Sequence, residues 1–340
     1  MIPPSVSILQ PTDWKNRLAT AIRDPEQLLR LLDLPLSLLP AAIQAAAQFP
    51  LRVPRGFINR MHKADPHDPL LLQVLPLHLE LDSDTGFVTD PTGDLPAMKQ
   101  PGLLHKYAGR VLLITTGACG IHCRYCFRRH FPYGEAHLDD QSVSSILDYL
   151  QQDSSIHEVI LSGGDPLVVS DSRLRLLIQR LETISHVKRL RIHTRMPVIV
   201  PERVTPELIQ TCSATRLQVI CVIHCNHANE IDATVIQALQ SLRDCGITLL
   251  NQAVLLKKIN DNADTLIELN ERLFSIGVQP YYLHQLDKVL GAAHFEVAPE
   301  LALQLQSECR KRLPGYMLPR LVQEVEGEPY KMPLIELDRR

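Results

Sequence analysis

From residue 110 onward, short apolar or β-branched runs alternate with longer amphipathic segments. The short runs are typical of buried strands, and the longer ones of helices with one apolar face. This alternation predicts right-handed βαβ units and a parallel sheet. We therefore expect an α/β fold, a partial (βα)6 barrel with parallel strands, in which the strands span 111–116, 158–164, 189–195, 217–224, 248–256 and 280–286 and the helices 142–152, 172–184, 207–212, 232–246 and 263–277.

Helix ends and strand ends carry distinctive residues in this pattern. Gly246 and Gly277 stand where a helix carboxyl cap favours positive φ. In α/β barrels the chemistry gathers at the carboxyl ends of the strands. The polar and glycine residues that occur there are candidates for the site: Cys119, Gly163, Asp165, Thr194, Arg195, His224, Asn251, Gln252 and Asp287.

Two segments lie outside the predicted barrel. We expect residues 1–100 to form an amino-terminal helical arm, with helical runs at 25–39 and 40–48 and then a loop-rich stretch dense in proline and aspartate. The barrel should span 101–298. A carboxyl-terminal extension, 299–340, should hold one helix and then extended segments joined by a Gly-Glu-Pro turn.

Charge and hydropathy narrow the class of protein. The net charge is −3, and nothing in the sequence indicates the strongly basic face that nucleic-acid binding needs. We therefore expect no nucleic-acid partner. The first residues lack the pattern of a signal peptide. The apolar stretch 31–51 contains Asp33, Pro35, Pro40 and Pro50, which favour short packed helices over a membrane span. We expect a cytoplasmic protein without a membrane partner, whose eight cysteines are thiols or metal ligands rather than disulfides.

Three cysteines, Cys119, Cys123 and Cys126, follow directly on the first predicted strand. Their close spacing lets one loop wrap a single metal centre. Three thiolates leave one iron of a four-iron cube open, and an open position is typical of a catalytic metal site. The alternative is a structural zinc loop with His122 or His130 as the fourth ligand, although no second ligand pair stands at suitable spacing.

A glycine pair ends the second predicted strand, in the segment Ser162-Gly163-Gly164-Asp165. Adjacent glycines let a backbone approach a ligand because no Cβ stands in the way. On its own the segment is typical of a plain turn. Its position one strand after the cysteine loop makes it a candidate binding element.

The cysteine spacing, with Tyr125 just before the last cysteine, resembles that of the radical S-adenosylmethionine enzymes. The resemblance implies a 4Fe-4S cluster on Cys119, Cys123 and Cys126, whose open iron binds the methionine part of S-adenosylmethionine. Electron transfer to that cofactor then generates a 5′-deoxyadenosyl radical. The resemblance also implies that the ammonium group of the cofactor is bound by Ser162, Gly163, Gly164 and Asp165.

Further stretches between residues 105 and 332 resemble the lysine 2,3-aminomutase branch, namely 106–110, 123–129, 162–167, 224–231, 249–261 and 280–287. That branch also uses pyridoxal 5′-phosphate. An imine to pyridoxal provides a π-system over which an unpaired electron can spread while an amino group migrates. The protein must hold the cofactors and the substrate within reach of one another.

The resemblance implies a pyridoxal phosphate site built around Lys331, the catalytic lysine that forms the imine. Such an amine needs a desolvated or cation-rich pocket. Lys106 and Arg110 match phosphate-binding cations, Tyr107 would lie against the pyridine ring, and Arg195 joins this set. Just before the lysine, the family has a run of glycines where this chain has Gly-Glu-Pro-Tyr.

Three further residues match the family's substrate site. Arg128 matches the arginine that grips the substrate carboxylate, a role that suits a planar guanidinium. Asp287 and Glu324 match the two carboxylates that hold the distal ammonium of L-lysine, and Glu324 stands where the family has aspartate. A buried ammonium needs such partners. The resemblance therefore implies lysine as the substrate.

The chain runs only to residue 340, and this compact form is similar to a short bacterial branch. That branch converts L-lysine to (R)-β-lysine for the modification of elongation factor P. The resemblance implies two partners, an electron-donor protein and a lysyl-tRNA-synthetase-like ligase, and leaves the oligomeric state open, a homo-oligomer included. The alternatives are an aminomutase for another amino acid, such as glutamate or arginine, and a non-catalytic zinc-binding module. Two carboxylates at the distal end argue against glutamate.

Overall fold

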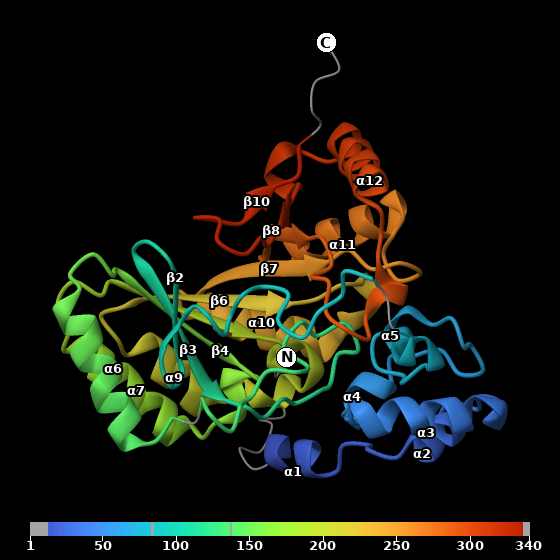
Figure 1. Ribbon diagram of the computed structural model, residues 1–340, viewed down its shortest axis with the longest axis horizontal. Coiled ribbons are helices and arrows are strands. Elements are labelled where there is room, and N and C mark those ends of the chain that lie inside the picture. The colour runs from blue at the N-terminus through green and yellow to red at the C-terminus, as the bar shows by residue number, and fades with distance from the viewer. Residues whose placement is uncertain (1–12, 83–84, 137, 336–340) are drawn as a thin grey trace, which may run out of the picture.

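The computed structural model describes residues 13–82, 85–136 and 138–335, and a ten-stranded sheet forms its centre (Figure 1). The strands lie side by side in chain order from β1 to β10. The strands from β3 to β9 pair in parallel, whereas β1 and β2 at one edge and β10 at the other pair antiparallel. The strands are β1 (Met98–Gln100), β2 (Leu103–Tyr107), β3 (Arg110–Thr116), β4 (Glu158–Gly163), β5 (Arg189–Thr194), β6 (Gln218–His224), β7 (Thr248–Val254), β8 (Gln279–His284), β9 (Arg320–Gln323) and β10 (Met332–Pro333).

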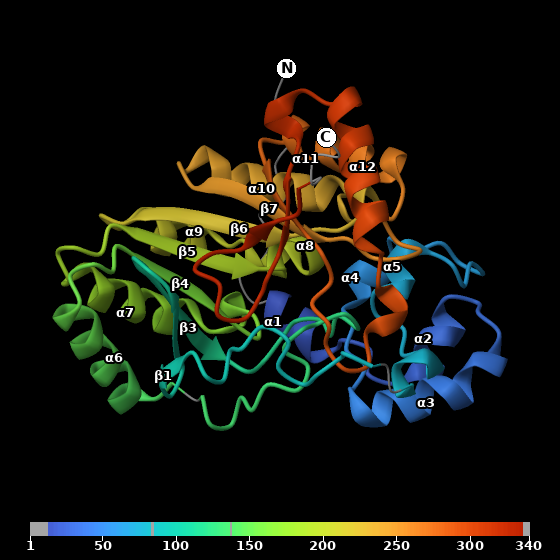
Figure 2. The same ribbon diagram turned by 45° about the horizontal axis from the view of Figure 1, so that its top comes forward.

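Helices connect the parallel strands, and a separate group of helices precedes the sheet. The connecting helices are α6 (Asp140–Gln152), α7 (Asp171–Glu182), α8 (Met196–Ile199), α9 (Pro206–Ser213), α10 (Ala233–Asp244), α11 (Ala263–Ser275) and α12 (Pro299–Arg312). The amino-terminal helices are drawn in blue in Figures 1 and 2. Those that gather at one end of the molecule are α2 (Pro25–Leu31), α3 (Leu39–Gln48), α4 (Arg55–Ile58) and α5 (Pro69–Leu72), whereas α1 (Asp13–Ala19) lies nearer the middle. None of the described helices is long and apolar enough to cross a membrane.

Local chemistry explains where the connecting helices begin and end. Each of α6, α7, α9, α10 and α11 starts after a residue whose side-chain oxygen accepts a hydrogen bond from a backbone N–H of the first turn: Asp139, Ser170, Thr205, Asp232 and Asn262. Such caps satisfy donors that a helix start leaves free. Gly246 and Gly277 follow α10 and α11 with φ of 82°, which confirms the predicted carboxyl caps.

The structure confirms the α/β class and the partial barrel. All six predicted strands are present as β3 to β8, but the parallel sheet also includes β9. The tail is extended on both sides of a turn at Gly327, as predicted. The strands β1 and β2 were not among the predicted ones: Lys106 lies in β2, and the β2–β3 hairpin pairs Tyr107 with Arg110. These short edge strands lack the alternation on which the prediction relied.

Candidate active site

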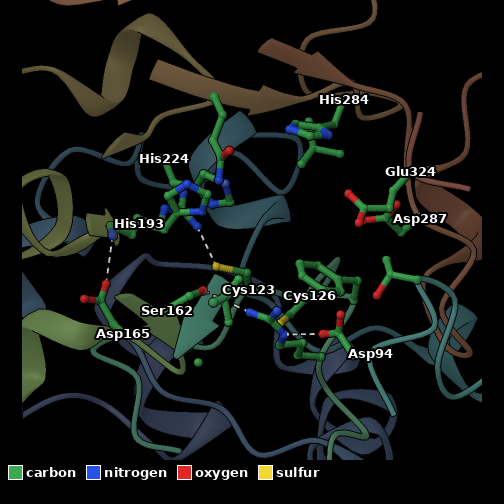
Figure 3. Close-up of a pocket in the computed structure, with 18 of the residues that line it drawn as sticks. Asp94, Cys123, Cys126, Ser162, Asp165, His193, His224, His284, Asp287 and Glu324 are labelled. Atoms are coloured by element: carbon green, nitrogen blue, oxygen red, sulfur yellow. Dashed lines mark hydrogen bonds and ion pairs between the residues drawn. The ribbon is translucent and has the colours of Figure 1, made fainter. Parts of the chain in front are cut away.

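One cavity of about 900 Å³ opens at the carboxyl ends of the parallel strands (Figure 3). Its walls come from β2 to β8, from the loop after β3 and from the tail around β9 and β10. Segments far apart in the chain therefore meet in one place. All residues to which the family resemblance gave a role line this cavity, whereas the strand-end candidate Asn251 does not. The lining residues are Lys106, Tyr107, Arg110, Cys119, Cys123, Cys126, Arg128, Ser162, Gly163, Gly164, Asp165, Arg195, Asp287, Glu324 and Lys331.

The loop after β3 brings the three clustered cysteines to one wall as free thiols. Burial raises the pKa of the Cys119 thiol well above its usual range, and the neighbouring Cys126 and Cys123 raise it further. Burial and Cys123 likewise raise the pKa of Cys126 to about 11. The sulfurs are therefore close enough to repel one another as thiolates, and a cationic centre between them would relieve that repulsion.

The geometry of the thiols bears on the kind of metal centre that they suit. Among the residues that the structure describes, no group of three or more His, Cys, Asp or Glu side chains is arranged to hold a metal ion. A zinc site draws all of its ligands to one atom. An iron–sulfur cube instead takes each thiolate on a different iron. The loop supplies three thiolates, those of Cys119, Cys123 and Cys126, so a cube that they held would have one corner left over.

The glycine pair at the end of β4 packs directly against the start of the cysteine loop. Gly163 has a φ of 115°, and the N–H groups of Gly164 and Asp165 donate to the carbonyls of Thr116 and Ala118 at 2.7 and 2.8 Å. A Cβ on Gly164 would lie 2.3 Å from the Ala118 oxygen. The glycines are needed here because the backbone approaches the cysteine loop itself.

Gly164→Ala should therefore disturb the loop that carries the cysteines. The clash is with backbone, which cannot move away like a flexible side chain, so we expect a loss of about 1–3 kcal/mol in the free energy of unfolding and weaker retention of iron. Denaturant unfolding and iron analysis measure the two effects. Gly134→Ala is the matched control, since a Cβ there meets nothing within 4 Å. Equal stability and iron content in the two variants would contradict this account.

The other members of the glycine segment already have partners. Asp165 accepts hydrogen bonds from the Thr194 hydroxyl at 2.7 Å and from the N–H groups of Arg195 and Leu167 at 2.7 and 3.0 Å. Its carboxylate therefore fastens β4 to the end of β5. The Ser162 hydroxyl accepts from Arg128 at 2.9 Å.

A chain of ion pairs runs along the cavity wall from the cysteine loop to the tail. Arg128 Nε lies 2.6 Å from Asp94 Oδ2, and Lys106 Nζ lies 2.6 Å from Asp94 Oδ1 and 3.4 Å from Glu324 Oε1. Lys331 completes the chain by pairing with Glu324. Although burial disfavours its charge, Asp94 has its pKa held down at about 2 by the two cations. Cations and carboxylates thus alternate along the wall, and a charged ligand could replace one member of a pair.

The tail end of the chain concentrates charge around Lys331. Glu324 also accepts a hydrogen bond from the Tyr107 hydroxyl at 2.8 Å. Asp287 lies near both Glu324 and Lys331, and its Oδ1 is buried without a hydrogen-bond partner among the described residues. Burial raises the pKa of Asp287 to about 7, Lys331 opposes this rise and Glu324 adds to it. An unpaired buried carboxylate oxygen beside a cavity is a ready acceptor for a cationic group.

Two of the predicted cations have different surroundings. The Arg110 guanidinium lies 4.6 Å from the centre of the Tyr107 ring, beside the Lys106 end of the wall. Arg195 instead contacts Cys123, Tyr125 and Glu230. These contacts lend no support to its predicted place with Lys106 and Arg110.

Several cavity residues were missing from the predicted site. His193, His224, Gln252 and His284 stand on the neighbouring strands β5, β6, β7 and β8. The three histidines lie in a row across the cavity (Figure 3). Burial lowers the pKa of all three histidines, that of His224 to about 4, so the row is neutral. His224 and Gln252 were recognised only as polar strand ends. Asp94 carried no sequence signal because it lies in a loop-rich stretch.

Comparison with known proteins decides the family. The Radical SAM superfamily matches residues 113–219. An L-lysine 2,3-aminomutase of Escherichia coli (strain K12) is 48% identical over 323 residues, which cover 95% of this chain and 94% of the relative. The chain belongs to the lysine 2,3-aminomutase family of radical S-adenosylmethionine enzymes. A member from Haemophilus influenzae is 46% identical, with 97% of this chain and 98% of the relative covered, and one from Clostridium subterminale is 33% identical, with 95% and 78% covered.

Membership of the aminomutase family makes this chain an isomerase and implies a 4Fe-4S cluster and S-adenosylmethionine. When bound, these two groups supply the 5′-deoxyadenosyl radical that starts the reaction. The free thiols of Cys119, Cys123 and Cys126 on one wall fit the cluster. An iron–sulfur cluster site therefore replaces the zinc-binding module as the interpretation of this loop.

Proposed function

We propose that this aminomutase converts L-lysine to β-lysine with pyridoxal 5′-phosphate held covalently by Lys331. The observation that carries the proposal is the arrangement of the cavity. The cysteine loop forms one wall, and Lys331 stands at the other end beside Glu324 and Asp287. The cysteine loop and Lys331 therefore face one shared cavity, which lets groups bound at its two ends react with each other.

The proposed pyridoxal phosphate site uses the β2–β3 hairpin and the tail. Lys106 and Arg110 provide cations for the phosphate, and Tyr107 between them offers a ring face to the pyridine. Lys331 forms an ion pair with Glu324, which holds its amine at this end of the cavity. The family's known use of this cofactor supports the assignment, as does the position of Lys106 and Arg110 in the cavity that Lys331 also lines.

The proposed substrate site lies between Arg128 and the two acidic residues. Arg128 binds the carboxylate of the amino acid, for which it would exchange part of its contact with Asp94. Asp287 and Glu324 bind the distal ammonium, and the unpaired Oδ1 of Asp287 is the acceptor available for it. Two carboxylates at this end favour a cationic side chain over that of glutamate.

S-adenosylmethionine is proposed to lie against the segment from Ser162 to Asp165, beside the cysteine loop. We assign recognition of the cofactor's ammonium to this segment as a whole. Its Asp165 carboxylate accepts three hydrogen bonds, and the carbonyls of Ser162 and Gly163 accept one each, from Thr115 and Tyr133. The close packing of Gly163 and Gly164 against the cysteine loop supports a role in shaping that end of the cavity.

Borohydride reduction tests the proposed pyridoxal phosphate site. The reagent converts an imine between the cofactor and an amine into a stable secondary amine, so peptide mass mapping locates the attachment. We expect the adduct on Lys331 and its loss in Lys331→Ala. Attachment at Lys257, Lys258 or Lys288 would refute the proposed site.

We further propose that the product is (R)-β-lysine and serves the modification of elongation factor P in the cytoplasm. The higher identity to the Escherichia coli relative than to the clostridial one supports the short bacterial branch, and the eight free cysteines suit a reducing compartment. The partners would be an electron-donor protein and a lysyl-tRNA-synthetase-like ligase. Elongation factor P from cells that lack this chain should then lack the mass of a β-lysyl group; a factor that kept it would contradict the proposal.

A further inference from the structure

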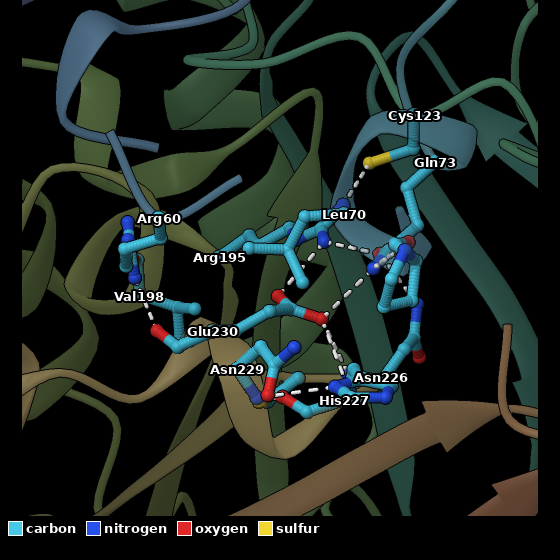
Figure 4. Close-up of polar contacts among 12 residues, drawn as sticks. Arg60, Leu70, Gln73, Cys123, Arg195, Val198, Asn226, His227, Asn229 and Glu230 are labelled. Carbon is cyan, nitrogen blue, oxygen red and sulfur yellow. Dashed lines mark hydrogen bonds and ion pairs between the residues drawn. The ribbon is translucent and has the colours of Figure 1, made fainter. Parts of the chain in front are cut away.

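Arg195 occupies a position beside one of the cluster cysteines (Figure 4). It follows β5, and its Nη1 donates to Cys123 Sγ at 2.8 Å and to the Tyr125 hydroxyl at 2.9 Å. Its Nη2 donates to Gln73 Oε1 at 2.5 Å and to Glu230 Oε2 at 2.9 Å. Both Nη atoms of the guanidinium are thus bound by acceptors of the protein, and Nη1 also reaches the Cys123 sulfur.

The partners of Arg195 form a buried polar network that leaves its guanidinium little freedom. Gln73 and Glu230 are fully buried, and Asn226 is 2% exposed. Glu230 Oε1 accepts from the N–H of Asn226 at 2.9 Å and from Gln73 at 3.1 Å. The Asn226 side chain also donates to Gln73 and to the Tyr125 hydroxyl. Hydrogen bonds to both Nη atoms restrict the guanidinium to one geometry.

The charges of this network decide what the contact with sulfur can do. Arg195 and Glu230 are a buried pair of opposite charge, so the guanidinium can stay charged without water. A hydrogen bond to a cluster sulfur stabilises whichever oxidation state carries more negative charge. The reduced cluster carries one electron more than the oxidised one. An N–H donated to Cys123 therefore favours reduction.

We propose that Arg195 is a positioning residue of the iron–sulfur centre, which donates to the Cys123 sulfur and so raises the reduction potential of the cluster. Glu230 and Gln73 hold the guanidinium in place and balance its charge. The inference rests on the cluster that the family implies and not on the proposed substrate or on pyridoxal phosphate. It gives Arg195 a different role from that of a phosphate-binding cation.

A redox titration of the anaerobically reconstituted protein tests this role, with the reduced cluster followed by electron paramagnetic resonance. In Arg195→Gln we expect unchanged iron content. At a given solution potential the ratio of reduced to oxidised cluster should be at least tenfold lower, which corresponds to a reduction potential lower by about 59 mV for one electron. Arg203→Gln is the control, because Arg203 is a buried arginine that pairs with Asp171 at 2.7 Å and does not line the cavity. That variant should keep the wild-type potential.

Glu230→Gln gives an expectation of opposite sign and serves also if Arg195→Gln fails to hold iron. Removing the carboxylate leaves the positive charge of Arg195 without its counter-charge. That charge then stabilises the reduced cluster more strongly, so the reduction potential should rise. Wild-type potentials in the variants that retain iron would overturn the proposal. So would an unchanged potential in Arg195→Gln with weaker binding of S-adenosylmethionine, because the Nε of Arg195 is buried without a partner among the described residues and would then serve that cofactor. Weaker binding of pyridoxal phosphate alone would restore the role predicted from the sequence.

Discussion

Cys123→Ala should abolish both cluster iron and aminomutase activity, and Cys119→Ala and Cys126→Ala should do the same. Each change removes one of the three thiolates that the loop after β3 supplies, and two thiolates cannot hold the cube. The loss should be complete and not partial, because no radical forms without the cluster. Iron analysis, visible absorbance and turnover under anaerobic conditions measure it.

The remaining cysteines provide the control for that experiment. Cys245 is exposed and Cys309 is buried in the core, and neither lines the cavity. Cys245→Ala should retain full iron and full turnover. Full iron and turnover in all three cavity variants would show that the cluster assignment is wrong.

Asp287→Asn should lower kcat/KM for lysine at least tenfold. The change keeps the shape of the side chain but removes the charge that the distal ammonium needs. A hydrogen bond to a charged group contributes about 1.5–3 kcal/mol, and about 1.4 kcal/mol corresponds to tenfold in kcat/KM. Cluster content, the pyridoxal spectrum and cleavage of S-adenosylmethionine without substrate turnover should stay close to wild type, because the change touches only the far end of the substrate.

The pH dependence of the same variant gives an independent check. Burial, partly opposed by Lys331 and reinforced by Glu324, raises the pKa of Asp287 to about 7. The carboxyl is therefore neutral below that pH and ionised above it. Since an ionised carboxylate binds the ammonium, kcat/KM for lysine should rise with pH through about 7, and this rise should be missing in Asp287→Asn. An identical profile in both proteins would contradict the role of Asp287.

Glu324→Asp examines the other half of the proposed clamp. The glutamate stands where the family has aspartate, and it already contacts Lys331, Lys106 and Tyr107. If its greater reach brings the carboxylate to the ammonium from a shifted backbone, the shorter side chain should raise KM for lysine. An unaffected KM for lysine in both Glu324→Asp and Asp287→Asn would mean that the substrate is held elsewhere or is not lysine.

Strand order and the position of the cysteine loop were predictable from the sequence because both depend on local pattern. Each of β3 to β8 contains a short run or an alternation of apolar residues, and the glycines after α10 and α11 mark helix ends. The edge strands were not predictable in the same way. β9 spans only Arg320–Gln323, which is too short for any periodicity, and it pairs with β8 across the intervening helix α12 in the sequence.

The partners of the charged residues were also beyond local pattern. A basic residue after a strand end can reach many places, and the contacts of Arg195 depend on Gln73 in the amino-terminal arm and Glu230 after β6. Asp94 likewise connects Arg128 with Lys106 across distant segments. Resemblance to a family could indicate which residues face the cavity, but only the folded chain reveals which of them neutralise one another.

The most direct test of the account is an anaerobic assay with L-lysine whose α-nitrogen alone is isotopically labelled. Reductant, S-adenosylmethionine and pyridoxal phosphate are supplied together and then omitted one at a time, and other amino acids are run in parallel. We expect the label on the β-carbon of β-lysine only when all three are present. Unchanged lysine in the complete mixture, with conversion of glutamate or arginine instead, would contradict the account.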